Sequence, residues 1–205
     1  MSRNELKDVE AALNHDLNNT LQVVMGNLEV LRRRAAFVPE IVEAALAATR
    51  NAAQLADRMV ALARLRNVER RRLDLNAALD DLADMMRRTL GDAIRLELAL
   101  SPDAGAVLVD PWCLQTALLE LAANARAAMP AGGKLTVRSS KARLEVVDNG
   151  PGMPAEKMAR AFDGPQPVTL GLYLVERCIR ACGGRVRIAA APARGTTVTL
   201  DLPTE

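Results

Sequence analysis

Hydrophobic residues recur at three- and four-residue spacing through the first third of the chain. Residues 3–35 carry one such repeat, which predicts a long helix; its members are Leu6, Val9, Leu13, Leu17, Leu21, Val24, Leu28 and Leu31. After a break at 36–39, a second repeat follows the heptad spacing of a coiled-coil seam; it comprises Ile41, Ala45, Ala48, Ala52, Leu55, Met59 and Leu62. Two such helices predict an antiparallel hairpin. Because one hairpin cannot bury a whole seam, we expect a homodimer with a four-helix bundle.

The pattern changes after residue 72, behind the basic stretch RLRNVERRR. Alternating and helical segments now follow one another. We expect helices from an Asn76 cap to Leu90, over 111–129 and over 170–182. The expected strands are 73–75, 94–100, 107–109, 135–138, 144–147, 185–189 and 196–202. The predicted fold class is α+β. An N-terminal helical hairpin over 1–66 is joined by a linker at 67–72 to an α/β sandwich over 73–205.

Composition and charge exclude several classes of protein. The 205 residues carry a net charge of +2, which excludes a strongly basic nucleic-acid binder. No apolar stretch approaches the roughly 18 to 20 residues of a membrane span, and the N-terminus has no apolar signal region. We therefore expect a cytoplasmic chain without a membrane segment. The three cysteines show no CxxC spacing, so we interpret them as reduced core residues.

The single histidine, His15, lies within LNHDLNNTL on the first predicted helix. At 100° per residue it points away from the stripe that holds Leu13 and Leu17. Asp16 follows directly, and a carboxylate beside an imidazole can orient the ring and accept its proton. Asn19 lies one turn further along the same face. The pattern is consistent with a nucleophilic histidine, and also with an ordinary surface histidine.

Polar side chains and glycines mark a second group of candidates. Glu120 and Asn124 share one face of an apolar helix. The pair is consistent with oxygen ligands of Mg²⁺, and also with the ordinary polar edge of an amphipathic helix. Asp148 ends an apolar strand and can accept a hydrogen from the exocyclic amine of adenine. Gly150 and Gly152 in VDNGPGM permit a tight loop there, although turn glycines are common. Further along the chain, TLGL opens a helix and GTT precedes the last strand.

The order and spacing of these motifs resemble the dimerisation and catalytic domains of sensor histidine kinases. The motifs are HDxNN on a helical hairpin, NARAAMPAGGKL, DNGPGM, a glycine at a helix start, and GTT. The resemblance covers essentially the whole chain. It is strong for hybrid-type kinases whose phosphoacceptor motif reads HDFNN. It implies that His15 accepts the γ-phosphoryl group of ATP, with Asp16 as its base or orienter. The phosphoryl group would pass to an aspartate of a response regulator, and Asn19 matches the position used to dephosphorylate that partner.

The second half is similar to the GHKL-type ATPase fold shared by gyrase, the heat-shock chaperone ATPase and mismatch-repair ATPases. This resemblance implies that Asn124 binds Mg²⁺, with Glu120 as the neighbouring acid of the same motif. It also implies that Asp148 binds the adenine of ATP, and that Gly150 and Gly152 shape the adjoining loop.

The lid segment departs from the family pattern. Phe162 matches the lid aromatic, Gly171 matches one glycine of the second glycine motif, and Thr197 falls in the closing segment under the adenine. The lid FDGPQPVTLG is short, and Pro167 and Thr169 stand where the family has glycines. Two alternatives therefore stay open. One is a phosphotransfer protein that relays phosphoryl groups between receivers without ATP. The other is a non-enzymatic binding module on the ATPase fold, such as an anti-sigma-type switch.

Overall fold

The computed structural model describes residues 19–30, 39–154, 156, 158, 161–162 and 170–204. These residues fall into two compact units, of which one ends at Arg64 and the other begins at Leu65. In the described part of the chain, no helix combines the length and the apolar character needed to cross a membrane.

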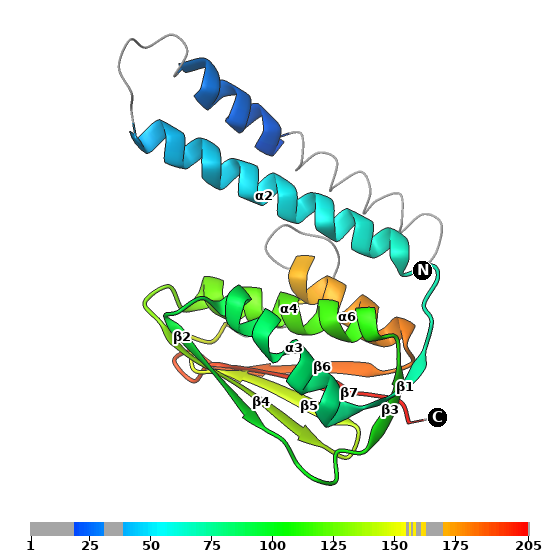
Figure 1. Ribbon diagram of the computed structural model, residues 1–205. Coiled ribbons are helices and arrows are strands. Elements are labelled where there is room, and N and C mark those ends of the chain that lie inside the picture. Colours follow the sequence, from blue (N-terminus) through cyan, green and yellow to red (C-terminus); the bar gives the residue numbers. More distant parts are fainter. Residues whose placement is uncertain are drawn as a thin grey trace. The chain divides into compact units, whose positions relative to one another are not determined.

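The first unit contains a helix at 19–30 and the helix α2 (Pro39–Arg64) beside it, running in the opposite direction (Figure 1). The predicted heptad seam of α2 is its protected side: Ala45, Ala48, Ala52 and Leu62 are buried. On the helix 19–30, Val24 is half-buried, whereas Leu21 and Leu28 are 44% and 54% exposed. Part of the predicted stripe is therefore not covered within one chain. The predicted hairpin also includes residues outside the described ones.

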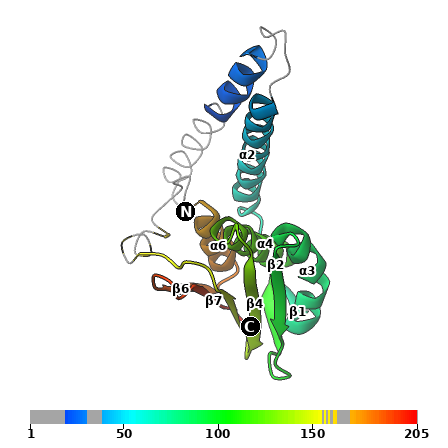
Figure 2. The same ribbon diagram turned by 90° about the vertical axis from the view of Figure 1, so that its left-hand side faces the viewer.

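The second unit is an α/β sandwich, as predicted. Its helices α3 (Leu75–Leu90), α4 (Pro111–Ala128) and α6 (Leu170–Ala181) cover one face of a five-stranded sheet (Figures 1 and 2). The strands lie in the order β2 (Ile94–Ala99), β4 (Gly133–Ser140), β5 (Arg143–Asp148), β7 (Thr196–Asp201) and β6 (Arg185–Ala190). Among the described strands, only β2 and β4 pair in parallel. A separate two-stranded sheet pairs β1 (Arg71–Asp74) with β3 (Ala106–Val109).

Leucines, valines and alanines fill the core between the helices and the sheet. Alternation along each strand directs one apolar set toward the helices. In β5 and β7 this set includes Leu144, Val146, Val198 and Leu200, all of them buried. The largest fully buried side chains are Leu75, Leu79, Met86, Leu90, Leu114, Leu118, Leu135, Leu144, Leu170, Leu174 and Ile179. A core of this kind needs few aromatic rings, which fits their 2% share of the sequence.

Two local predictions were wrong. The N-cap of α3 is Asp74 and not Asn76, because the Asp74 carboxylate accepts a hydrogen bond from the Ala77 backbone amide at 2.9 Å. Asn76 instead donates to the carbonyl of Ser101. The strand predicted at 73–75 also begins earlier, at Arg71, because the backbones of Arg71 and Arg72 already pair with Val109 and Leu108 in β1.

The cysteines are buried and free, as predicted. Cys113 on α4 lies against Cys178 on α6 and the adjoining Cys182. A hydrogen bond with Cys178, with burial adding to it, raises the pKa of Cys113 to about 12. A hydrogen bond with Cys113 and burial likewise raise the pKa of Cys182. Both thiols therefore stay protonated at neutral pH, and they pack as small apolar side chains.

Candidate functional site

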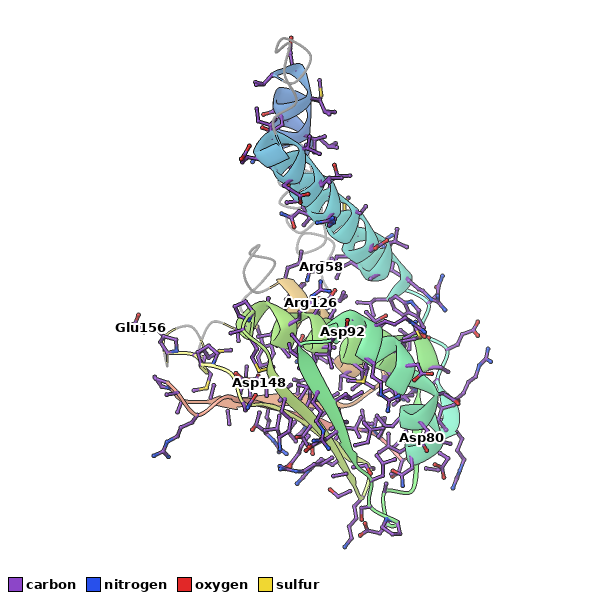
Figure 3. The ribbon with its side chains drawn as sticks, turned by 60° about the vertical axis from the view of Figure 1, so that its left-hand side comes forward. Arg58, Asp80, Asp92, Arg126, Asp148 and Glu156 are labelled. Carbon is purple, nitrogen blue, oxygen red and sulfur yellow. The ribbon has the colours of Figure 1, made fainter. Side chains whose placement is uncertain are left out.

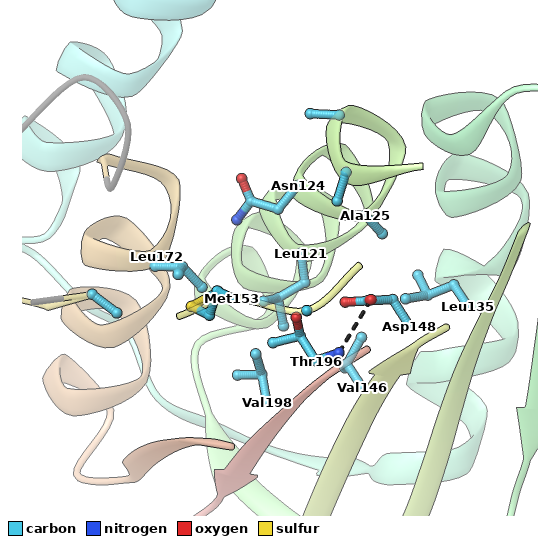
Figure 4. A pocket seen from close by; sticks show the side chains of 14 residues that line it. Leu121, Asn124, Ala125, Leu135, Val146, Asp148, Met153, Leu172, Thr196 and Val198 are labelled. Atoms are coloured by element: carbon cyan, nitrogen blue, oxygen red, sulfur yellow. Dashed lines mark hydrogen bonds between the residues drawn. The ribbon is translucent and has the colours of Figure 1, made fainter. Parts of the chain in front are cut away.

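A cavity of about 280 Å³ opens between α4, the loop after β5, the start of α6 and strands β5 and β7. It is lined by Leu121, Asn124, Ala125, Ala127, Ala128, Leu135, Val146, Asp148, Gly152, Met153, Ala161, Leu172, Thr196 and Val198. Most of these side chains are apolar, and two stand out as polar groups on opposite sides (Figure 4). Asn124 lies on the helix side and Asp148 on the sheet side. A small apolar cavity with a few convergent polar groups is typical of a ligand site.

Helix α4 holds Asn124 in place. The helix starts at Pro111, with Asp110 as its N-cap, and the Asp110 carboxylate also accepts a hydrogen bond from the Glu69 backbone amide. Its apolar side is buried in the core, so Glu120 and Asn124 lie at the edge of that side. The amide nitrogen Nδ2 of Asn124 is buried and has no hydrogen-bond partner among the described residues. A buried polar atom without a partner is costly, so this amide is suited to donate a hydrogen bond to a ligand in the cavity.

The start of α6 packs directly on this pair. A Cβ atom at Gly171 would lie 2.8 Å from Oε2 of Glu120 and 3.0 Å from Oδ1 of Asn124. The predicted glycine therefore brings α6 close to the two polar side chains. Leu172 next to it lines the cavity. The structure thus brings together the predicted residues Glu120, Asn124 and Gly171, which lie up to 51 positions apart in the sequence (171 − 120 = 51).

Asp148 is the last residue of β5, and its carboxylate is fixed by the backbone. Oδ1 accepts hydrogen bonds from the amides of Gly150 at 2.9 Å and Thr196 at 3.1 Å. None of the described residues donates to Oδ2. Figure 3 places Asp148 in the strand layer, beneath the helix that carries the exposed Arg126. The side chain can therefore offer one free acceptor oxygen to the cavity.

The predicted loop glycines lie beside Asp148. A Cβ at Gly150 would lie 3.0 Å from both Oδ1 of Asp148 and Cγ of Met129. Gly152 has a φ of +68°, and a Cβ there would lie 2.0 Å from the carbonyl oxygen of Ala191. At Gly152 no other residue type fits without displacing the loop, whereas at Gly150 the neighbouring side chains would have to shift by a few tenths of an ångström.

Five of the predicted residues are not among those that line the cavity. Glu120, Gly150 and Gly171 adjoin Asn124 or Asp148, whereas Thr197 and Phe162 do not. Thr197 is on the opposite face of β7, because successive strand residues alternate, and Thr196 lines the cavity in its place. Thr196 is paired in register with Asp148. Phe162 is half-buried and its neighbour Ala161 lines the cavity. Asn19 is exposed on the helix 19–30. His15, Asp16, Pro167 and Thr169 lie outside the described residues.

Comparisons with known proteins place part of the second unit in a known family. Residues 109–205 match the family described as histidine kinase-, DNA gyrase B-, and HSP90-like ATPase. Sensor kinase CckA of Brucella abortus (strain 2308) is 29% identical over 92% of this chain. Signal transduction histidine-protein kinase AtoS of Escherichia coli (strain K12) is 25% identical over 97% of it. Residues 109–205 belong to this ATPase family.

A solved structure shares the fold of this chain. The Acinetobacter baumannii histidine kinase AdeS aligns with a TM-score of 0.72 over 93% of this chain and 98% of its own, at 20% identity. The chain spans 23% of the length of CckA and 35% of the length of AtoS. The cavity beside Asp148 lies within the ATPase domain, so ATP is its expected ligand.

Proposed function

We propose that this chain acts as the core of a two-component histidine kinase. In this proposal residues 1–66 form the phosphoacceptor hairpin, 67–72 connect the two parts, and 73–205 bind ATP. The observation that carries the proposal is the Asp148 carboxylate, with one oxygen held by two backbone amides and the other free at an apolar cavity.

The cavity suits an adenine base. Flat apolar surface can be buried between Leu121 on α4 and Val146 and Val198 on the sheet. The free oxygen of Asp148 can only accept while the carboxylate is ionised, so it favours a base edge that donates from an exocyclic amine. The corresponding carbonyl oxygen of guanine would face the carboxylate with like partial charge.

The residues at the other side of the cavity suit a hydrated Mg²⁺ ion and phosphates. Oδ1 of Asn124 and the Glu120 carboxylate are oxygen ligands of the kind that Mg²⁺ prefers. When bound, the ion neutralises charge on the phosphates. The orphaned Nδ2 of Asn124 would gain an acceptor in a phosphate oxygen. This donor and acceptor set fits the expected group.

His15 would then receive the γ-phosphoryl group. The lone pair of its free ring nitrogen attacks the γ-phosphorus, the bond to the β,γ-bridging oxygen breaks, and ADP leaves with the electron pair. Asp16 takes the proton from the other ring nitrogen. The phosphoryl group passes next to a response-regulator aspartate. Asn19 would orient a water molecule that later hydrolyses this aspartyl phosphate and releases inorganic phosphate.

A second heptad stripe on α2 supports the proposed homodimer. Next to the protected seam, apolar residues and one threonine recur at the same four- and three-residue steps: Val42, Leu46, Thr49, Ala53, Ala56, Val60 and Ala63. Leu46 is 42% exposed and Val60 is 68% exposed within one chain. One helix thus carries two adjacent seams, and only one of them is covered. A four-helix bundle with a second copy would bury the other.

Placing a charge in this second stripe is expected to split the dimer. Val60→Glu would bury a carboxylate in the proposed interface, at a cost of several kcal/mol if it stays unpaired. Light scattering behind a sizing column measures the mass directly. We expect the mass of two chains for the wild type and of one chain for Val60→Glu. The control Asn51→Glu adds the same charge to the opposite, exposed side of α2 and should remain a dimer. A wild-type mass of one chain would contradict the proposal.

Labelling experiments test the kinase directly. The protein is incubated with Mg²⁺ and ATP labelled at either the γ- or the α-phosphorus. We expect acid-labile label on the protein from γ-labelled ATP only, and its transfer to a receiver domain. A relay without ATP gives the opposite pattern: no label from ATP, and label arriving from a phosphorylated receiver.

A further inference from the structure

Two loops meet behind the Asp148 side chain. The loop 149–153 follows β5, and the loop 191–195 joins β6 to β7. The amide of Ala193 donates to the carbonyl of Pro151 at 2.8 Å. A Cβ at Gly195, whose φ is +72°, would lie 2.0 Å from the carbonyl oxygen of Asp148. The backbones are therefore in direct contact, with no room for a side chain between them.

This contact determines what the Asp148 carboxylate can do. Because Gly195 has no side chain, the start of β7 comes close enough for the Thr196 amide to reach Oδ1. The Gly150 amide reaches the same oxygen from the other loop. Two donors from two loops restrain the carboxylate against rotation about its terminal bond. Only Oδ2 remains to meet a ligand, in one orientation.

We propose that Gly195 is a positioning residue that makes the site selective for a purine with an exocyclic amine over one with a carbonyl group. The inference rests on the proposed binding of ATP and adds to it. Inosine triphosphate is the natural probe, because hypoxanthine differs from adenine by carrying a carbonyl oxygen at C6 and a hydrogen on N1. A fixed Oδ2 meets the amine of adenine and opposes the carbonyl of hypoxanthine. A carboxylate that can turn could instead accept the N1 hydrogen of hypoxanthine.

The experiment compares the affinities of ATP and inosine triphosphate by calorimetry, in the full chain with Mg²⁺. The wild type should prefer ATP. In Gly195→Ala the new methyl group pushes the Thr196 amide away, and the preference should fall by about tenfold, the equivalent of about 1.4 kcal/mol. Gly105→Ala is the matched control, because Gly105 has a φ of +73° and a Cβ there would meet only the Asp103 carbonyl at 4.0 Å. It imposes similar backbone strain without contact to Asp148, and its preference should equal that of the wild type.

The ratio of the two affinities separates positioning from a merely structural role. If Gly195→Ala weakens both nucleotides by the same factor, the proposal is wrong. A thermal melt shows whether the variant is folded. If it is not, Thr196→Pro carries the same test, since it removes the amide donor at the first strand residue, where proline is tolerated. If the wild type binds ATP and inosine triphosphate equally well, the proposed selectivity is wrong but the proposed binding of ATP stands. A wild type that binds neither nucleotide would overturn the proposed function together with it.

Discussion

His15→Ala is expected to abolish the labelling of the chain by γ-labelled ATP. The chain contains one histidine, so no other imidazole can take over the phosphoryl group. The loss should be complete rather than partial, because the nucleophile itself is removed. Autoradiography of denatured protein after incubation with labelled ATP and Mg²⁺ measures the outcome.

The same variant should bind ATP as tightly as the wild type. The cavity residues all belong to the second unit, and His15 precedes it in the chain. Unchanged affinity together with lost labelling would place the defect in the chemical step. Label that persists on His15→Ala would show another phosphoacceptor and contradict the assignment of His15. Asp16→Asn is a milder variant, since it keeps the imidazole but weakens the proton acceptor beside it. It should retain part of the rate of phosphorylation.

Asp148→Asn is expected to weaken ATP binding by about 30- to 1,000-fold, or about 2 to 4 kcal/mol. The asparagine Oδ1 can still accept from the Gly150 and Thr196 amides, so the loops should stay in place. Its amide group would then occupy the position of Oδ2 and face the amine of adenine with a donor. The variant should also reverse the preference between ATP and inosine triphosphate, because an amide donor suits a carbonyl oxygen. Calorimetric titration of both nucleotides measures the change.

The control for this variant lies on the same strand. Glu145→Gln makes the same change from carboxylate to amide on the face of β5 that points away from the cavity. It should leave both affinities unaltered. If Asp148→Asn also binds ATP normally, the carboxylate does not contact the base, and the adenine must be bound elsewhere.

Periodicity predicted the elements well because each carries its own apolar repeat. The seam of α2 and the alternating strands β2, β5 and β7 lie where their spacing indicates. The residues at which helices and strands begin and end were harder to predict. Asp74 and Asn76 are both good capping residues, and which one caps α3 depends on where β1 ends, which its pairing with β3 decides. Sequence spacing alone does not contain that information.

The cavity was predicted in part. The motifs around Asn124 and Asp148 led to both polar groups, and Gly152 lines the cavity. The cavity is lined by Thr196 and not by the predicted Thr197, because the motif GTT leaves open which threonine faces inward. The buried Val198 and Leu200 in the same strand give the signal, since even-numbered positions of β7 face the helices. Contacts between distant segments, such as Gly195 against Asp148, could not be predicted from local pattern at all.

Titration of ATP into the wild-type chain in the presence of Mg²⁺ tests the central claim most directly. In the proposed function, the cavity, the Asp148 carboxylate and the unpartnered amide of Asn124 together hold the nucleotide. We expect saturable binding of one ATP per chain, and competition by ADP. The titration is run at two temperatures, because the enthalpy of binding can be zero at one of them. Absence of binding heat at both temperatures would contradict the proposed binding of ATP.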